Sequence, residues 1–123
     1  MAITPLILAS FVAVASCADD GVGVTPLQGW RDWNEYGGGI TQDIMLSTMA
    51  AVAAPFPGTN VSLASLGFRD VGLDDVWQQC GSYGPFNWTY HDADGNPVVD
   101  AARFPNMSAL PATAHSLGLT AGF

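Results

Sequence analysis

The stretch Leu73-Asp74-Asp75-Val76-Trp77 decides the fold, because it places two neighbouring carboxylates at the end of a short apolar run and an indole directly after them. Carboxylates at the end of a buried strand are costly to desolvate, so a fold that keeps them there supplies hydrogen bonds to them. A polyol meets that need, because carboxylates accept hydrogen bonds from hydroxyl groups and an aromatic face covers the apolar side of a sugar ring. The alternative is a turn with two solvated acids, and the rest of the chain has to decide between them.

Length and charge narrow the classes of function. The chain has 123 residues and a net charge of −8, with only three cationic side chains, all arginines. The length fits one ordinary domain, and four tryptophans argue against intrinsic disorder. An acidic surface repels phosphate backbones and anionic lipids. We therefore expect a folded domain with no nucleic-acid partner and no peripheral membrane role.

The first 18 residues have the pattern of a secretory signal peptide. Ile3 to Ala15 is apolar and uncharged, too short to span a bilayer, and is followed by small residues. Ala18 is the expected last residue of the signal. The alternative is a bacterial lipoprotein signal, with lipid attached to Cys17. We expect the mature chain, residues 19–123, to be secreted or delivered to a lysosome or vacuole, without a membrane anchor once the signal is removed.

Sequons and cysteines bear on the same question. Three N-glycosylation sequons, at Asn60, Asn87 and Asn106, favour the eukaryotic secretory pathway. Without the signal, Cys80 is the sole cysteine, and an unpaired thiol is unusual in an oxidising compartment. Either Cys80 stays buried and reduced, or its disulfide partner belongs to chain outside this sequence.

The expected elements alternate as strand, helix, strand, helix, strand. The first strand precedes Trp30, Thr41 caps the first helix, and a strand over 68–73 delivers the paired acids. A helix over 107–117 and a strand over 119–123 follow. This order implies parallel pairing with crossover helices, an α/β arrangement. A three-stranded sheet that ends in its own strand leaves an uncovered edge, so we expect a fold cut short.

Local patterns refine these elements. Met45, Met49 and Val52 fall at i, i+4 and i+7 and predict the buried face of the first helix, while Asn106 is the expected cap of the second. The run Asp92-Ala93-Asp94-Gly95-Asn96 resembles the start of a calcium loop, but its glycine comes too early and no glutamate closes it. We interpret it as a β-turn and expect neither a metal nor another cofactor.

Five short motifs occur in a fixed order along the chain. Together they resemble the N-terminal part of the retaining α-galactosidases, the melibiase-like group that also includes α-N-acetylgalactosaminidases. The resemblance covers the chain from about Thr25 to Phe123, and its specificity lies in the ordered series. The motifs are Gly29-Trp30-x-x-Trp33-Asn34, Leu73-Asp74-Asp75-x-Trp77, Asp94-Gly95-Asn96, Arg103-Phe104-Pro105 and His115-Ser116-x-Gly118-Leu119.

The resemblance implies a (β/α)₈ TIM barrel, of which this chain would form about two and a half βα units. It implies a sugar pocket at the C-terminal ends of the strands, where barrel enzymes place their active sites. Trp30 would line that pocket, and Trp77 is a candidate for its wall. Asp74 and Asp75 would accept hydrogen bonds from the hydroxyls of a terminal α-linked galactose, so their role would be binding and selection.

The same resemblance implies that the catalytic acids lie outside this sequence. Retaining hydrolysis needs a nucleophile and an acid/base roughly 5 Å apart, which the family supplies from later strands, beyond Phe123. Adjacent side chains on a strand point to opposite faces, so Asp74 and Asp75 do not replace that pair. Residues 19–123 are therefore expected to be a partial catalytic domain, truncated at the third strand and inactive alone. The alternatives are an α-N-acetylgalactosaminidase of the same family, a non-catalytic galactose-binding module, and an acidic interaction protein with coincidental motifs.

The chain departs from the family pattern at two places. The family has a cysteine directly after the double aspartate, bonded to one in the first loop, where this chain has Val76 and Gly37-Gly38-Gly39. Both partners are missing together, which indicates a lost bridge. The segment Pro55–Asn60 is longer than usual and suggests a divergent subgroup. In a longer version of the protein, we expect Cys80 to bond to a cysteine outside this sequence and anchor the loop beside the pocket.

Overall fold

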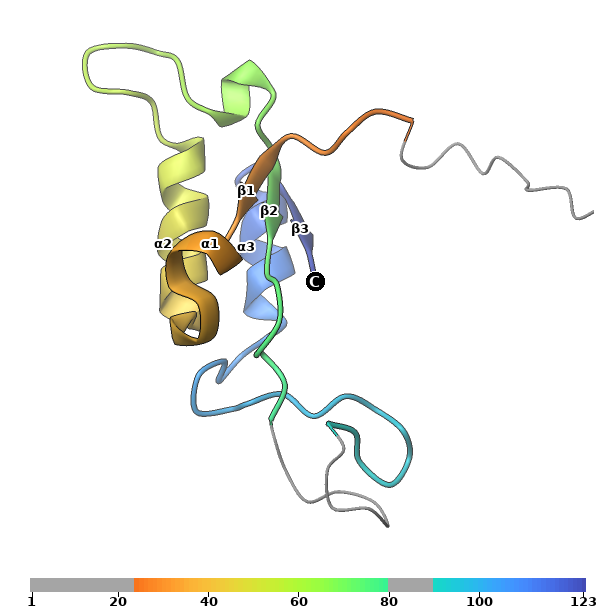
Figure 1. Cartoon of the computed structure of the whole chain (residues 1–123). Helices are drawn as coiled ribbons and strands as arrows, with labels where there is room; N and C mark the ends of the chain where they lie inside the picture. The colour runs from red at the N-terminus through yellow and green to blue at the C-terminus, as the bar shows by residue number, and fades with distance from the viewer. Residues whose placement is uncertain (1–23, 80–89) are drawn as a thin grey trace, which may run out of the picture.

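The computed structural model describes residues 24–79 and 90–123 (Figure 1). The expected signal peptide over 1–18, the disulfide of Cys80 and the sequon at Asn87 lie outside these residues. Among the helices of the described ranges, none is long and apolar enough to cross a membrane.

Three short parallel strands form the sheet. They are β1 (Gly29–Arg31), β2 (Asp70–Gly72) and β3 (Thr120–Gly122), with β2 in the centre. Val71 pairs with Trp30 on one side and with Ala121 on the other. The predicted order and parallel pairing are confirmed, although the strand expected over 68–73 is shorter. Leu73 still donates its N–H to the carbonyl of Gly122 at 2.9 Å, so pairing with β3 continues one residue past β2.

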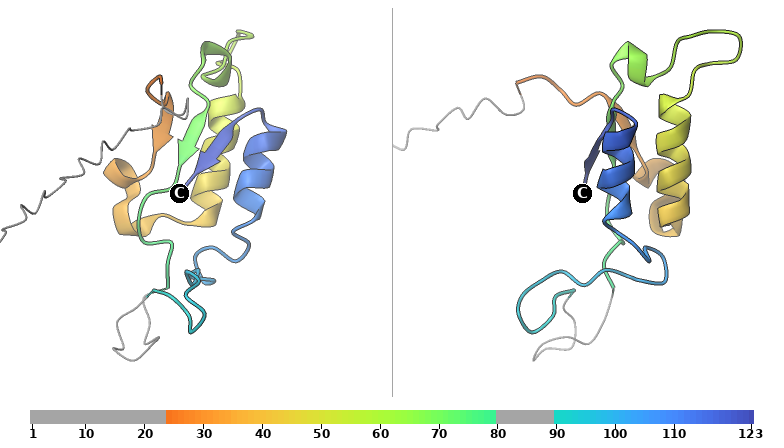
Figure 2. Two further views of the ribbon diagram at one scale, coloured as in Figure 1. Left: turned by 90° about the vertical axis from the view of Figure 1, so that its right-hand side faces the viewer. Right: turned by 180° about the vertical axis from the view of Figure 1, so that it is seen from behind.

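Two helices cover one face of this sheet. Helices α2 (Gln42–Ala53) and α3 (Ala109–Ser116) lie side by side behind the strands, and no described element covers the opposite face (Figures 1 and 2). The chain after β1 forms the short helix α1 (Trp33–Tyr36) and the 3₁₀ turn η1 (Gly37–Gly39), and a second 3₁₀ turn, η2 (Ala64–Leu66), precedes β2. The result is a two-layer α/β unit with one open sheet face.

The two helix starts differ from each other. Thr41 caps α2 as predicted, because its side chain accepts the N–H of Ile44. The prediction that Asn106 caps α3 is wrong: the helix begins at Ala109, and Ser108 occupies the cap position without a side-chain bond. Asn106 Oδ1 instead accepts the Ser108 hydroxyl at 2.8 Å, so this oxygen bonds a side chain rather than the helix backbone.

The hydrophobic core lies between the helices and β2. Met45, Met49 and Val52 are buried, as the helical spacing predicts. Phe104 is the largest fully buried side chain, with 1% of its surface exposed, and anchors the loop that leads into α3. The other buried apolar residues in the described part of the chain are Ile40, Val71, Leu73, Leu110, Ala114 and Leu119.

The segment after residue 90 contains the β-turn expected at Asp92–Asn96. Asp92 Oδ1 accepts the backbone N–H groups of Asp94 and Asn96, each at 2.9 Å. Gly95 has a φ of 83°, a left-handed conformation that favours glycine. The backbone N–H of Asn96 is the main reason why the pKa of the Asp92 carboxyl lies below 3.8, its ordinary value.

Replacing Gly29 by alanine tests the contact between β1 and β2. A Cβ at this position would overlap the backbone carbonyl of Asp70, which cannot move without breaking the sheet. We expect Gly29→Ala to lower the free energy of unfolding by about 3 kcal/mol or more, measured by chemical denaturation. Gly72→Ala is the matched control, because its Cβ would meet only the mobile guanidinium of Arg31 and should cost less than about 1.5 kcal/mol. Equal losses for both variants would contradict this packing.

The lowered pKa of Asp92 predicts how the turn responds to acid. Because the folded pKa lies below 3.8, the turn is fully stabilised by Asp92 above that pH and loses this support as the pH falls through the folded value. We expect the amide NMR signals of Asp94 and Asn96 to shift with a midpoint below pH 3.8. Asp92→Asn should abolish this titration step. A midpoint at or above 3.8 would disprove the prediction.

Candidate functional site

The C-terminal ends of the three strands meet at one edge of the sheet. Because the strands are parallel, the residues that follow Arg31, Gly72 and Gly122 emerge side by side (Figure 2). This edge carries both predicted acids. It is the natural place to look for a site, since ligands of parallel α/β sheets bind outside the carboxyl ends of the strands.

Asp32 fastens the end of β1 to the end of β2. Its side chain is fully buried, and its Oδ1 accepts the backbone N–H of Asp74 at 2.8 Å. Its backbone carbonyl accepts the N–H groups of Glu35 and Tyr36 at the start of α1. Asp32 Oδ2 is buried and has no hydrogen-bond partner within the described ranges. Sequence reasoning missed this residue, although an acid directly after a strand is the same signal that identified Asp74.

The two predicted acids have different surroundings. Both side chains are exposed. Asp74 Oδ1 accepts the backbone N–H of Asp75 at 2.9 Å, so this carboxylate stabilises its own turn. Asp75 lines a hollow of about 430 Å³ together with Val76, Gln78, Gln79, Tyr90, Asp100 and Arg103. Asp75 is therefore the better placed of the two to accept a hydrogen bond from a ligand hydroxyl.

The three tryptophans of the first two motifs lie in different surroundings. Trp30 pairs in register with the buried Val71, so its indole lies on the helix side of the sheet, half-buried and 6.1 Å from the ring of Tyr36. Trp33 begins α1, and 46% of its surface is exposed. Trp77 is half-buried, with its ring 6.4 Å from that of Phe123. The structure thus brings Trp77 to the edge that carries the acids, while the pocket role of Trp30 stays a prediction.

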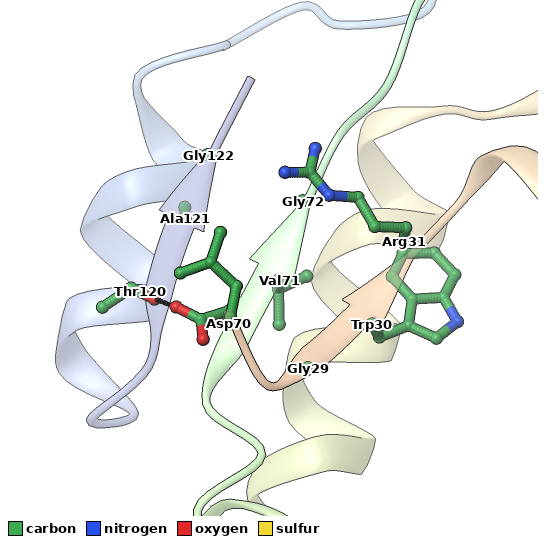
Figure 3. A pocket seen from close by; sticks show the side chains of 10 residues that line it. Gly29, Trp30, Arg31, Asp70, Val71, Gly72, Thr120, Ala121 and Gly122 are labelled. Atoms are coloured by element: carbon green, nitrogen blue, oxygen red, sulfur yellow. Dashed lines mark hydrogen bonds between the residues drawn. The ribbon is translucent and has the colours of Figure 1, made fainter. Parts of the chain in front are cut away.

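A second hollow lies on the open face of the sheet and has a different character. Its floor is formed by the three strands, and Arg31 lies across β2 above Gly72 (Figure 3). Asp70 at its rim accepts the hydroxyl of Thr120 and the backbone N–H of Gln28. Asp70 therefore stabilises the pairing of β2 with its two neighbouring strands. Neither predicted acid lines this hollow.

The chemistry of the edge is that of hydrogen-bond acceptance. Asp74 and Asp75 offer carboxylate oxygens beside aromatic side chains, which suits a polyhydroxylated ligand. In the residues that the structure describes, no group of three or more histidine, cysteine, aspartate or glutamate side chains could hold a metal ion.

Comparisons with known proteins relate the chain to one kind of enzyme. No protein-family model matches it. The α-galactosidase of Cyamopsis tetragonoloba is 34% identical over 106 residues, which are 85% of this chain and 22% of that protein. The α-galactosidase of Torulaspora delbrueckii is 34% identical over 101 residues, 82% of this chain and 18% of that protein.

Solved structures give the same result. α-Galactosidase I from Mortierella vinacea superposes with a TM-score of 0.67 at 29% identity, over 85% of this chain and 23% of that one. The Saccharomyces cerevisiae α-galactosidase with raffinose also gives 0.67, at 26% identity, over 88% of this chain and 21% of that one. The chain spans about a fifth of the length of these proteins. The resemblance inferred from the ordered motifs is thus confirmed, and over most of its length this chain is related to the α-galactosidases.

Proposed function

We propose that this chain is part of a retaining glycoside hydrolase that removes terminal α-linked galactose from oligosaccharides or glycoconjugates. One observation carries the proposal: a double aspartate closely follows the central parallel strand in a segment that is 34% identical to an α-galactosidase. In this proposal the segment selects the sugar. The catalytic nucleophile and the acid/base belong to residues outside this sequence.

We also propose that residues 19–123 are a partial (β/α)₈ barrel domain and that residues 1–18 are its signal peptide. A barrel has helices outside its strands and side chains filling its interior. Within the described ranges, the three strands have helices on one face only, and the other face carries Arg31, Asp70 and Thr120 (Figure 3). Such a face suits the inside of a barrel that further strands would close.

Within the proposed pocket, Asp75 is the main contact for the sugar. Its carboxylate is exposed at the C-terminal edge, where it can accept hydrogen bonds from two neighbouring hydroxyls. Asp74 assists through its own oxygens and by holding the N–H of Asp75. Trp77 at the same edge would form a wall of the pocket, and Trp30 would contribute the part of its indole that the core leaves open.

The geometry that a retaining glycosidase needs separates the residues that select the sugar from those that cleave its bond. The two catalytic carboxylates of a retaining enzyme lie about 5–5.5 Å apart on either side of the scissile bond. One carboxylate oxygen of Asp74 already accepts the N–H of Asp75, and Asp75 lines a hollow that Asp74 does not line. Two neighbouring acids held in this way suit selection of a sugar better than cleavage of its bond.

We further propose that the protein travels through the secretory pathway, to the outside or to a lysosome or vacuole. Two of the three sequon asparagines, Asn60 and Asn106, are exposed and accessible to glycosylation. Asn87 and a disulfide from Cys80 to a partner outside this sequence remain part of the proposal. The expected bound molecule is a terminal α-galactoside, without nucleic acid or a cofactor.

Asp75→Asn tests the proposed sugar contact in the complete protein, meaning this chain together with the residues that supply the catalytic acids. The amide loses the charge of the acceptor, so we expect kcat/KM for an α-galactoside to fall by about 5- to 150-fold, or about 1–3 kcal/mol. The melting temperature should change little, because Asp75 is exposed. Asp94→Asn, an exposed acid in the turn after residue 90, is the control and should keep full activity. Full activity of Asp75→Asn would disprove the assignment.

Expression of the 123 residues alone tests the division of labour. We expect no measurable hydrolysis of a nitrophenyl α-galactoside, because the proposed nucleophile and acid/base are absent. The isolated chain should also be poorly soluble, since no described segment pairs with the outer edges of β1 and β3 or covers the second face of the sheet. Hydrolysis by the purified chain, with a rate that survives removal of trace contaminants, would show that the catalytic acids lie within it.

A further inference from the structure

The residue directly after Asp75 has a strained backbone. Val76 has a φ of 65°, and in the described ranges it is the one non-glycine residue with a positive φ. A β-branched side chain crowds the backbone in this region, so the conformation persists only when neighbouring groups hold it. Such strain next to a proposed sugar contact prompts the question of what holds Val76.

Arg103 holds it through the backbone carbonyl. Arg103 Nη1 donates to the carbonyl of Val76 at 2.8 Å, and Nη2 donates to the carbonyl of Ile40 at 2.6 Å and to that of Gly38. One half-buried guanidinium thus joins the turn after β2 to η1 and to the entry of α2. These bonds have a charged donor in a rigid planar fork, which makes them stronger and more directional than neutral ones.

The backbone of Arg103 is fixed as well. Its N–H donates to the carbonyl of Asp100 at 3.1 Å, and its own carbonyl accepts the N–H of Gln42 at the start of α2. The next residue, Phe104, is buried in the core with 1% of its surface exposed. The guanidinium therefore extends from a rigid base, and a displacement of Val76 would have to break its bond.

We infer that Arg103 is a positioning residue for the sugar contact of Asp75. By holding the carbonyl of Val76, it keeps Val76 in the left-handed region, and this fixes the direction in which the chain leaves Asp75. Asp75 and Arg103 line the same hollow. In this inference, the fixed backbone holds the carboxylate of Asp75 in one orientation there. The inference rests on the proposed function, and it assigns Arg103 an effect that passes through Val76.

A double-mutant cycle in the complete protein tests this pathway. The variants are Arg103→Lys, Val76→Gly and the two combined, with galactose affinity measured by calorimetry. Lysine cannot reproduce the fork, so we expect Arg103→Lys to raise the Kd for galactose about tenfold. Glycine accepts a positive φ without help, so in the Val76→Gly background Arg103→Lys should weaken binding much less. The Kd of the double variant should therefore lie close to that of Val76→Gly alone. Arg69→Lys is the matched control, because Arg69 donates to the carbonyl of Ala64 beyond the other end of β2 and should leave the Kd within about twofold.

Two results would overturn the inference. The first is a wild-type Kd in Arg103→Lys. The second is additivity, in which Val76→Gly leaves the defect of Arg103→Lys undiminished, because Arg103 would then act on the fold as a whole. If wild-type protein binds no galactose, the proposed function fails and the positioning role fails with it. Coupling of the two variants in the melting temperature would still report the Arg103–Val76 contact, so the two failures are distinguishable.

A second pair of variants keeps the test open if Arg103→Lys does not fold. Val76→Gly and Val76→Ala both remove the isopropyl group, only glycine accepts a positive φ without cost, and Arg103 is intact in both. We expect both variants to bind galactose within about twofold of wild type, because Arg103 still holds the carbonyl of residue 76, and Val76→Ala to melt at a lower temperature than Val76→Gly. A several-fold loss of affinity in Val76→Ala alone would show that Arg103 does not hold this conformation, and equal melting temperatures would show that residue 76 is not held in the left-handed region. Either result would overturn the inference.

Discussion

The hydrogen bonds on both sides of β2 are the constraint from which the rest of the structure follows. With three residues in each strand, the sheet has little backbone pairing to lose, and β2 takes part in all of it. Close approach of β1 requires Gly29, since any Cβ there would meet the backbone of Asp70. Val71 in the centre faces the helices and is buried. Because the strands are parallel, fixing β2 also fixes the edge at which Asp32, Asp74 and Phe123 emerge.

Four acids surround the ends of β2, and three of them accept hydrogen bonds from different partners. Asp70 bonds to Gln28 and Thr120 and so serves the start of the strand. Asp32 is buried and holds the N–H of Asp74, and Asp74 in turn holds the N–H of Asp75. This relay places the carboxylate of Asp75 at the edge, with the hydrogen bonds of the two preceding acids supporting its backbone. Three of the eleven acidic side chains of the sequence thus accept backbone N–H groups around this strand.

Those features that depend on local pattern could be predicted from the sequence. Alternation of strands and helices gave the parallel order, because a crossover helix leaves no simple alternative, and the spacing of Met45, Met49 and Val52 identified the buried face of α2. Features that depend on contacts between distant segments could not. The role of Asp32 requires a partner 42 residues away. Likewise, the motif that contains Trp30 does not reveal that the pairing of β1 with β2 turns this indole toward the helices. The failed prediction of the cap has a local cause instead, because Asn106 accepts the hydroxyl of Ser108, two residues further along the chain.

The guanidinium of Arg103 also bears on the missing disulfide. In the pattern that the resemblance implies, a cysteine at the position of Val76 would be bonded to one in the loop that holds Gly37–Gly39. Here Arg103 joins Gly38 and Ile40 to Val76 by hydrogen bonds, so the same two segments are connected without a covalent bond. A disulfide acts mainly by restricting the unfolded chain, whereas a guanidinium acts only where its three carbonyl partners are already in place. The loop beside Asp75 therefore depends on the packing of Phe104 and α2 behind it. The guanidinium of Arg103 connects the loop to that packing, and the same guanidinium holds Val76 in its strained conformation.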